Sequence, residues 1–151
     1  MYPTTKSSES GKERAVQQLL RDLGYSFVTH ARLPGTPDIL LAEKRIVIRI
    51  QGCFYHRHEG CRDCTTPKRF PDHWNKKFAG IQARDRNARF QLLGMRYRLL
   101  SIWGCAIRDH LADPLRERLA AFIEGTMRER EIGKAELLEA LHAGAAGSIA
   151  K

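Results

Sequence analysis

The chain has 151 residues, of which 42% are hydrophobic and 28% charged, and its 26 lysines and arginines outnumber 17 aspartates and glutamates to give a net charge of +9. This composition favours one globular domain and excludes a disordered or fibrous chain, and no run approaches the roughly 20 apolar residues that a membrane helix needs. The positive charge indicates a polyanionic partner, most often nucleic acid. Because the first residues lack the apolar core of an export signal, we expect a cytoplasmic protein with reduced cysteines.

The first part of the chain is expected to form a helix followed by three strands. Apolar residues at helical spacing predict a helix over residues 9–23, with Glu13 at the border of its apolar stripe. Runs of apolar and β-branched residues predict strands at 25–33, 39–42 and 46–50. The turn Leu33-Pro-Gly-Thr-Pro delivers Asp38 to the head of the second strand, which forms a hairpin with the third.

A long helix is predicted over residues 72–93, with Asp72 as its N-cap and Gly94 as its stop. Asp85 falls within the apolar stripe of this helix. A buried carboxylate is costly unless a cation, a metal or a hydrogen-bond donor compensates it, and a histidine would serve. The pattern therefore predicts a partner for Asp85.

The remaining elements are one strand and two helices. The strand is predicted over 97–103 and leads to Cys105, and Asp113-Pro114 predicts a helix that begins there and runs to about Arg130. A short peripheral helix is predicted over 135–141, before a frayed end. This order of elements predicts an α/β fold in which a mixed sheet is flanked by helices.

Residues 51–64 concentrate the unusual chemistry of the chain. Three potential metal ligands have the close spacing of a tetrahedral zinc site: Cys53, His58 and Cys61. Cys105 could complete the site, and Cys64 could compete for that place. A zinc site here would hold an aromatic pair and a free imidazole on a stiff loop, namely Phe54, Tyr55 and His56. Such a loop suits a catalytic base beside an aromatic wedge for DNA.

Four motifs, in this order, resemble those of the very short patch repair (Vsr) endonucleases, zinc-containing members of the PD-(D/E)xK restriction-endonuclease superfamily. The motifs are Leu33-Pro-Gly-Thr-Pro-Asp38, Gly52-Cys-Phe-Tyr-His-Arg-His58, Arg84-Asp85 and Trp103-Gly-Cys105. The resemblance implies a restriction-endonuclease-like sheet with a structural zinc loop. The similarity runs from about Glu13 to Ile107. We expect a nuclease domain at 9–130, between a flexible N-terminus (1–8) and a peripheral helix with a frayed tail (131–151).

The resemblance also implies catalytic roles for matching residues. Asp38 and the backbone carbonyl of Ile50 would bind catalytic Mg²⁺, and Glu13 would hold metal-bound waters. His56 would activate the attacking water, and Asp85 would orient its imidazole. Gln51 stands where the family commonly has a second active-site histidine, and an amide can bind phosphate or water without taking a proton.

Further roles concern zinc and DNA. The resemblance assigns the structural Zn²⁺ to four residues: Cys53, His58, Cys61 and Cys105. Phe54 and Tyr55 would insert between bases beside a mismatch, where unstacking costs least. Phosphate contacts are expected from three basic residues: Arg57, Lys68 and Arg69.

The expected function is that of a magnesium-dependent endonuclease that nicks one strand of double-stranded DNA beside a T·G mismatch. We expect a monomer that acts at the bacterial nucleoid, where mismatch-repair proteins are candidate partners. One alternative is a restriction or defence nuclease without mismatch specificity. Another is a zinc-stabilised DNA-binding module that has lost catalysis. Gln51 and the short N-terminal arm favour the module, whereas Asp38, His56, Asp85 and Glu13 favour an enzyme.

Overall fold

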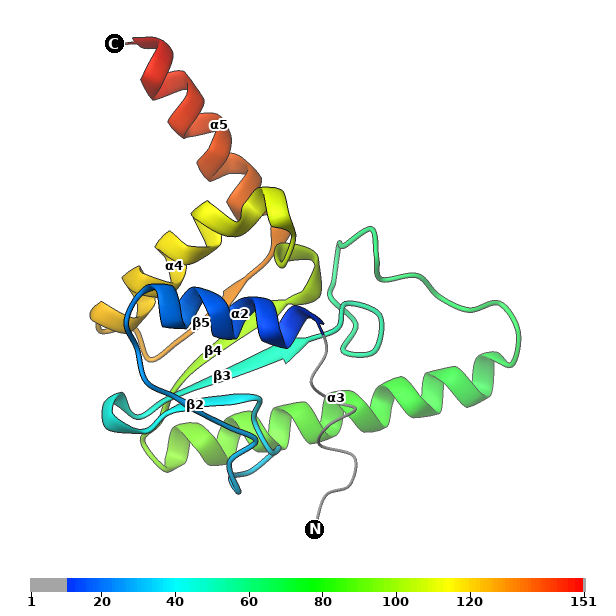
Figure 1. Ribbon diagram of the computed structural model, residues 1–151. Helices are drawn as coiled ribbons and strands as arrows, with labels where there is room; N and C mark the ends of the chain where they lie inside the picture. The colour runs from blue at the N-terminus through cyan, green and yellow to red at the C-terminus, as the bar shows by residue number, and fades with distance from the viewer. Residues whose placement is uncertain (1–10, 151) are drawn as a thin grey trace.

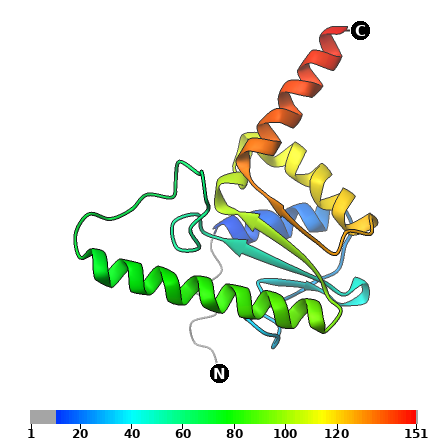
Figure 2. The same cartoon turned by 180° about the vertical axis from the view of Figure 1, so that it is seen from behind.

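A computed structural model describes residues 11–150, with side chains for residues 11–144, so the segment expected to be flexible (1–8) lies outside the described residues. The fold is a five-stranded mixed sheet with helices on both faces, as Figures 1 and 2 show, which confirms the predicted restriction-endonuclease-like fold class. One long helix crosses one face of the sheet, and two helices cover the other.

The sheet has the strand order β1-β2-β3-β4-β5. The strands are β1 (Val28–Thr29), β2 (Ile39–Leu41), β3 (Ile46–Gln51), β4 (Arg98–Trp103) and β5 (Glu129–Ile132). The pairs β1–β2 and β2–β3 are antiparallel, whereas β3–β4 and β4–β5 are parallel. The α-helices of the described residues are α2 (Gly11–Asp22), α3 (Pro71–Gly94), α4 (Ala112–Glu124) and α5 (Lys134–Ala150).

Alternation along β3 divides the interior into two cores. Ile46 and Ile48 point to the face covered by α2 and α4, where they join the larger apolar cluster. Val47 points to the opposite face and packs with Leu92 of α3 and Leu99 of β4. Both faces of the central strands are therefore buried, which explains why β3 and β4 are almost continuously apolar.

Two helix starts differ from the sequence prediction. Phe70, in a left-handed conformation, precedes α3, and Pro71 is its first residue, so Asp72 is inside the first turn and is not the N-cap. The α4 helix begins at Ala112, and Asp113 instead accepts a hydrogen bond from Arg116 (2.7 Å). Both aspartates keep a favourable position near the positive end of a helix without capping it.

The strand pattern was only partly predicted. The helix expected to run to about Arg130 ends at Glu124, and residues 129–132 form the edge strand β5. The sequence Glu-Arg-Glu-Ile has little intrinsic strand preference, and pairing with β4 overrides it. At the other edge, β1 has only two residues instead of the nine expected.

The C-terminal helix α5 leaves the body of the molecule, as Figure 1 shows. Leu137, in its first turns, is buried in the larger core. The helix runs to Ala150, beyond the end expected at Leu141, in keeping with its alanine-rich sequence. Within the described part of the chain, no helix combines the length and apolar character needed to cross a bilayer.

Candidate active site and metal centre

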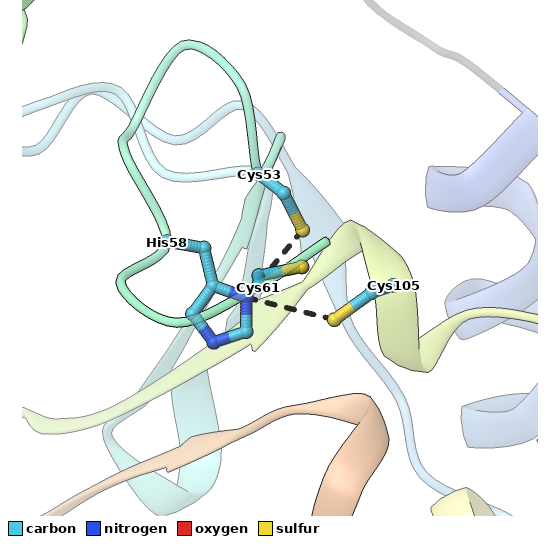
Figure 3. A group of neighbouring side chains, drawn as sticks. All are labelled: Cys53, His58, Cys61 and Cys105. Atoms are coloured by element: carbon cyan, nitrogen blue, oxygen red, sulfur yellow. Dashed lines mark hydrogen bonds between the residues drawn. The ribbon is translucent and has the colours of Figure 1, made fainter. Parts of the chain in front are cut away.

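Four potential zinc ligands gather at one end of the sheet. Three come from the loop that follows β3, and the fourth comes from the short turn after β4: Cys53, His58, Cys61 and Cys105. The topology explains this meeting, because β3 and β4 are parallel neighbours with Gln51 opposite Trp103, so the segments after them leave the same edge. Figure 3 shows the four side chains pointing toward one another.

The geometry of this cluster suits a single ion. One ligand atom from each residue lies within 4.8 Å of the others. Nδ1 of His58 lies 3.6 Å from Sγ of both Cys53 and Cys105, the two contacts drawn in Figure 3. Cys64 is outside the group. A donor set of three thiols and one imidazole fits tetrahedral Zn²⁺.

The surroundings fix the orientation of His58. Its ring stacks on Trp103 with a centroid separation of 4.2 Å and an interplanar angle of 4°. The Trp103 indole in turn donates to Oε1 of Glu131 in β5 (2.9 Å). A chain of contacts thus runs from the sheet edge to this candidate ligand, the kind of outer support that ligating histidines usually have.

Burial sets the protonation of these groups. It raises the pKa of the Cys53 and Cys105 thiols and lowers the pKa of the His58 imidazole. Without a cation the two thiols are therefore neutral, and so is the imidazole in the form that binds metals. A bound zinc ion would hold the sulfurs as thiolates and expel their protons.

The second constellation is a histidine–aspartate pair between the zinc loop and α3. Nδ1 of His56 lies 2.6 Å from Oδ2 of Asp85, in the middle of α3. Each side chain is a little over one quarter exposed, at 28% and 27%. Because a carboxylate accepts, the neutral imidazole holds its proton on Nδ1 and leaves Nε2 as a base. The sequence required a partner for Asp85, and the structure brings His56 to it.

Asp38 faces this pair from the head of β2. Its Oδ2 accepts a hydrogen bond from the backbone N–H of Ile50 (2.7 Å), which places the Ile50 peptide beside the carboxylate. Burial raises the pKa of Asp38, and this effect is opposed by the Ile50 hydrogen bond and the nearby histidines, His30 and His56. A half-buried carboxylate that lines a pocket is a suitable cation ligand.

A pocket of about 270 Å³ joins these groups. Asp38, His56 and Asp85 all line it, together with Gly35, Thr36, Pro37, Arg49, Ile50, Gln51, Arg84 and Ala88. Gln51, 5% exposed, reaches it from the end of β3. The pocket therefore contains a carboxylate, an oriented imidazole and basic side chains, which are groups that can support phosphodiester hydrolysis.

Arg49 is a lining residue that the sequence analysis did not single out. From β3 it donates to the Asp85 carbonyl (3.3 Å) and to Oγ of Ser101 (3.2 Å). A guanidinium remains charged even when burial lowers its pKa, as it does here. The sequence feature that could have predicted a special role for Arg49 is its position as the charged residue in the apolar run Ile-Val-Ile-Arg-Ile.

Glu13 and His30 complete this region. Glu13 of α2 is 4% exposed, and its Oε2 lies 3.2 Å from Nε2 of His30. Together with Asp38 they form a second group whose ligand atoms lie within 4.8 Å of one another. His30 was not predicted as a site residue from the sequence. The hairpin register points to it, since pairing of Thr29 with Ile39 sets residue 30 opposite Asp38.

The residues expected to contact DNA have different environments. Phe54 packs edge-to-face against Tyr55, Trp74 and Phe78, at centroid distances of 5.0, 5.4 and 5.3 Å. Tyr55 is 47% exposed at the margin of this cluster. Lys68 and Arg69 are exposed in the segment that leads to α3.

Arg57 is held inside its own loop. It donates to the Thr65 carbonyl (2.7 Å) and to Oγ1 of Thr66 (2.8 Å), and its guanidinium lies 4.0 Å from the Phe78 ring centroid. These contacts join the loop after Cys53 to the segment before α3. In this conformation Arg57 supports the loop and offers little of its guanidinium to a phosphate.

Comparisons with known proteins identify the family of this chain. A family model described as DNA mismatch endonuclease Vsr matches residues 1–63. The type II nicking enzyme V.XorIIP of Xanthomonas oryzae pv. oryzae is 38% identical over 105 residues, which cover 69% of this chain and 76% of that protein. The DNA mismatch endonuclease Vsr of Escherichia coli is 37% identical over 117 residues, covering 75% of this chain and 74% of that protein. With its sheet, its cysteine–histidine cluster and these relatives, the chain belongs to the Vsr family of DNA endonucleases.

Proposed function

We propose that this DNA endonuclease nicks one strand of duplex DNA beside a T·G mismatch, in a magnesium-dependent reaction of very short patch repair. One observation carries the proposal: the His56–Asp85 pair and the Asp38 carboxylate line the same pocket, at the edge where the zinc loop leaves the sheet. The names of the relatives, a mismatch endonuclease and a nicking enzyme, support cleavage of one strand.

The protein's part in the chemistry begins with a water molecule. Nε2 of His56 would accept a proton from this water as its oxygen attacks the scissile phosphorus. The bond from phosphorus to the leaving sugar oxygen would break, and that oxygen would take a proton from solvent. Asp85 holds the opposite ring nitrogen (2.6 Å) and would stabilise the imidazolium that forms. Proton transfer to a positioned base of this kind contributes about 10²–10⁴-fold to rate.

Oxygen donors in the pocket suit Mg²⁺. Asp38 and the Ile50 carbonyl would hold the ion, and Glu13 would orient waters bound to it. When bound, the ion supplies charge neutralisation for the phosphoryl oxygens as the phosphodiester is cleaved. Arg49, which lines the same pocket, would reinforce the positive potential that retains the phosphate.

The structural Zn²⁺ would act by position. Cys53 precedes and His58 follows the three residues that carry the wedge and the base, so both ends of this short segment would be tied to one ion. Cys105 would connect that ion to β4 and thus to the sheet. A rigid loop would keep the His56 imidazole within hydrogen-bonding distance of Asp85, whereas a mobile loop would reach that distance only part of the time.

DNA recognition would use charge and an exposed ring. The net charge of +9 favours binding to the phosphate backbone, and Lys68 and Arg69 are exposed in the segment that leads to α3. Tyr55 is the exposed member of the cluster formed with Phe54, Trp74 and Phe78, and it would insert at a weakly paired step. Phe54 packs edge-to-face against its ring. Mismatch preference would follow, because a T·G pair costs less to unstack than a matched pair.

The experiment is a nicking assay on two labelled duplexes that differ in one T·G or T·A pair. The zinc-loaded protein is tested with Mg²⁺ and with Ca²⁺ in its place, because a chelator would also remove zinc. We expect a single-strand nick at the mismatch, only with Mg²⁺, and none from a His56→Ala variant that still binds DNA. Equal nicking of both duplexes would replace mismatch repair by a restriction-associated function. DNA binding with no nicking under any condition would leave a binding module.

We also propose that the enzyme acts as a monomer in the bacterial cytoplasm, at the nucleoid. The organisms of its relatives, which are bacteria, support this cellular location.

A further inference from the structure

We propose that His30 is a direct ligand of the catalytic metal ion, so that the ion is bound by one imidazole nitrogen as well as by carboxylate oxygens. The proposal rests on the proposed function, because it adds a donor to the ion that Asp38 would bind, and it makes Glu13 a direct ligand of that ion instead of a residue that acts through bound waters. It predicts a site that favours Mn²⁺ over Mg²⁺ more strongly than oxygen ligands alone would.

The distances agree with one shared ion. An octahedral ion with bonds of about 2.1 Å separates neighbouring ligand atoms by about 3.0 Å. Nε2 of His30 and Oε2 of Glu13 lie 3.2 Å apart, close to that edge length. All three ligand atoms, including one from Asp38, lie within 4.8 Å of one another. Small side-chain adjustments would bring them onto the same cation.

The backbone fixes His30 at this place. Its N–H donates to the Asp38 carbonyl (3.1 Å), which continues the β1–β2 ladder by one residue beyond Thr29 and Ile39. His30 also has a φ of +51°, a left-handed conformation that histidine adopts more often than most residues. An uncommon conformation next to a reactive carboxylate is the kind of local strain found at binding sites.

The burial of these side chains favours a bound cation. The side chains of His30 and Glu13 are 14% and 5% exposed, and Asp38 is half-buried beside them. Two carboxylates with oxygens within 4.8 Å of each other repel, which costs free energy that a cation between them would remove. A divalent ion held by both, with a neutral imidazole as third ligand, would offset this cost.

The nitrogen donor determines which ions fit. Mg²⁺ prefers oxygen ligands and water, whereas imidazole suits the first-row transition metals, among which Mn²⁺ accepts both kinds of donor. A histidine that only oriented Glu13, without touching the ion, would leave this preference unchanged. The two roles can therefore be separated by spectroscopy.

The test compares wild type with His30→Asn, because asparagine tolerates the left-handed backbone but removes the imidazole. Zinc-loaded protein, without DNA, is titrated with Mn²⁺ and the free ion is measured by electron paramagnetic resonance. Electron spin echo modulation then reports ¹⁴N coupling to the bound Mn²⁺. We expect imidazole ¹⁴N coupling in wild type, its loss in His30→Asn, and about tenfold weaker Mn²⁺ binding in the variant.

Two further variants control the assignment. His110 is exposed and far along the chain, so His110→Ala should keep both the coupling and the affinity. His56→Ala should also keep the coupling, which shows that the nitrogen is not that of His56. Far-ultraviolet circular dichroism and zinc content verify that each variant is folded.

Persistence of imidazole coupling in His30→Asn, or its absence in wild type, would overturn the proposal. If Mg²⁺-dependent nicking were intact in that case, the proposed function would stand and only the His30 ligand would be lost. If ¹⁴N coupling were present but no divalent ion supported nicking, the ligand assignment would stand and the proposed function would fail.

Discussion

Oδ2 of Asp85 lies 2.6 Å from Nδ1 of His56, although the two residues are 29 positions apart and belong to a long helix and an irregular loop. The contact resolves a local conflict, since a carboxylate in the apolar stripe of α3 needs a donor. It also leaves one nitrogen of the imidazole for a substrate. Structure and proposed catalysis thus depend on the same hydrogen bond.

Replacement of Asp85 by asparagine should separate these two roles. The amide can still reach Nδ1 but cannot stabilise an imidazolium, and it can favour the wrong tautomer. We expect single-turnover nicking to fall by about 10²–10⁴-fold while DNA affinity changes little. Asp72→Asn, on the exposed first turn of the same helix, is the matched control and should retain wild-type rates. Equal rates for both variants would show that the pair is only structural.

The fourth zinc ligand can be tested by two cysteine variants. Cys105 is 2% exposed and belongs to the cluster, whereas Cys64 does not. Cys105→Ser should lower zinc content and reduce Tm by on the order of 10 °C, because a structural zinc site contributes several kcal/mol. Cys64→Ser should bind one zinc per chain with a nearly unchanged Tm. The reverse pattern in metal analysis would assign the site to Cys64.

Zinc affinity should depend steeply on pH. Burial raises the pKa of the Cys53 and Cys105 thiols, so in the metal-free protein both are protonated near neutral pH and must release their protons when zinc binds. Affinity should therefore fall as pH falls, by about 100-fold per pH unit from the protons of these two thiols alone. Competition with a chromophoric chelator at two pH values measures this slope. A flat profile would show that the thiols are already ionised before zinc arrives.

The two adjacent aromatics should respond differently to truncation. Phe54 packs against two rings of α3, so Phe54→Ala should reduce the free energy of unfolding by about 1–3 kcal/mol. Tyr55 is 47% exposed, so Tyr55→Ala should leave the Tm nearly unchanged. It should instead reduce the fluorescence increase of 2-aminopurine placed beside the mismatch, which reports base unstacking. A normal increase in Tyr55→Ala would assign the wedge elsewhere.

Local chemistry explains which features could be predicted from the sequence. The ligand spacing around Cys53 and the motif ending at Asp38 are continuous stretches, so their presence was visible before any fold was known. The need of Asp85 for a partner followed from helical periodicity alone. Before the fold was known, only the family resemblance favoured Cys105 over Cys64, and the parallel register of β3 and β4 supplies the physical reason why Cys105 joins the cluster.

The features that were missed depend on tertiary contacts. The strand β5 has a polar sequence and owes its conformation to pairing with β4, together with the ion pair between Arg89 and Glu129. His30 gained significance only from its position opposite Asp38 in a hairpin whose first strand has two residues. In both cases the feature depends on a pairing partner elsewhere in the chain, and the local sequence pattern is too weak to predict that pairing.

Gly35 is expected to control the distance between Asp38 and α3. Its φ is +78°, and a Cβ there would lie 2.8 Å from Cβ of Ala88, one turn after Asp85. Gly35→Ala should therefore push the turn from the helix, lower the free energy of unfolding by about 1–3 kcal/mol and reduce nicking as Asp38 moves. Gly94→Ala, at an open position with no such φ, is the control and should be neutral in thermal unfolding. Adding Ala88→Gly to Gly35→Ala removes the clash, so nicking should recover in part even though the helix glycine costs about 1 kcal/mol. If the double variant is no more active than Gly35→Ala, the strained backbone and not the close approach to α3 limits this position.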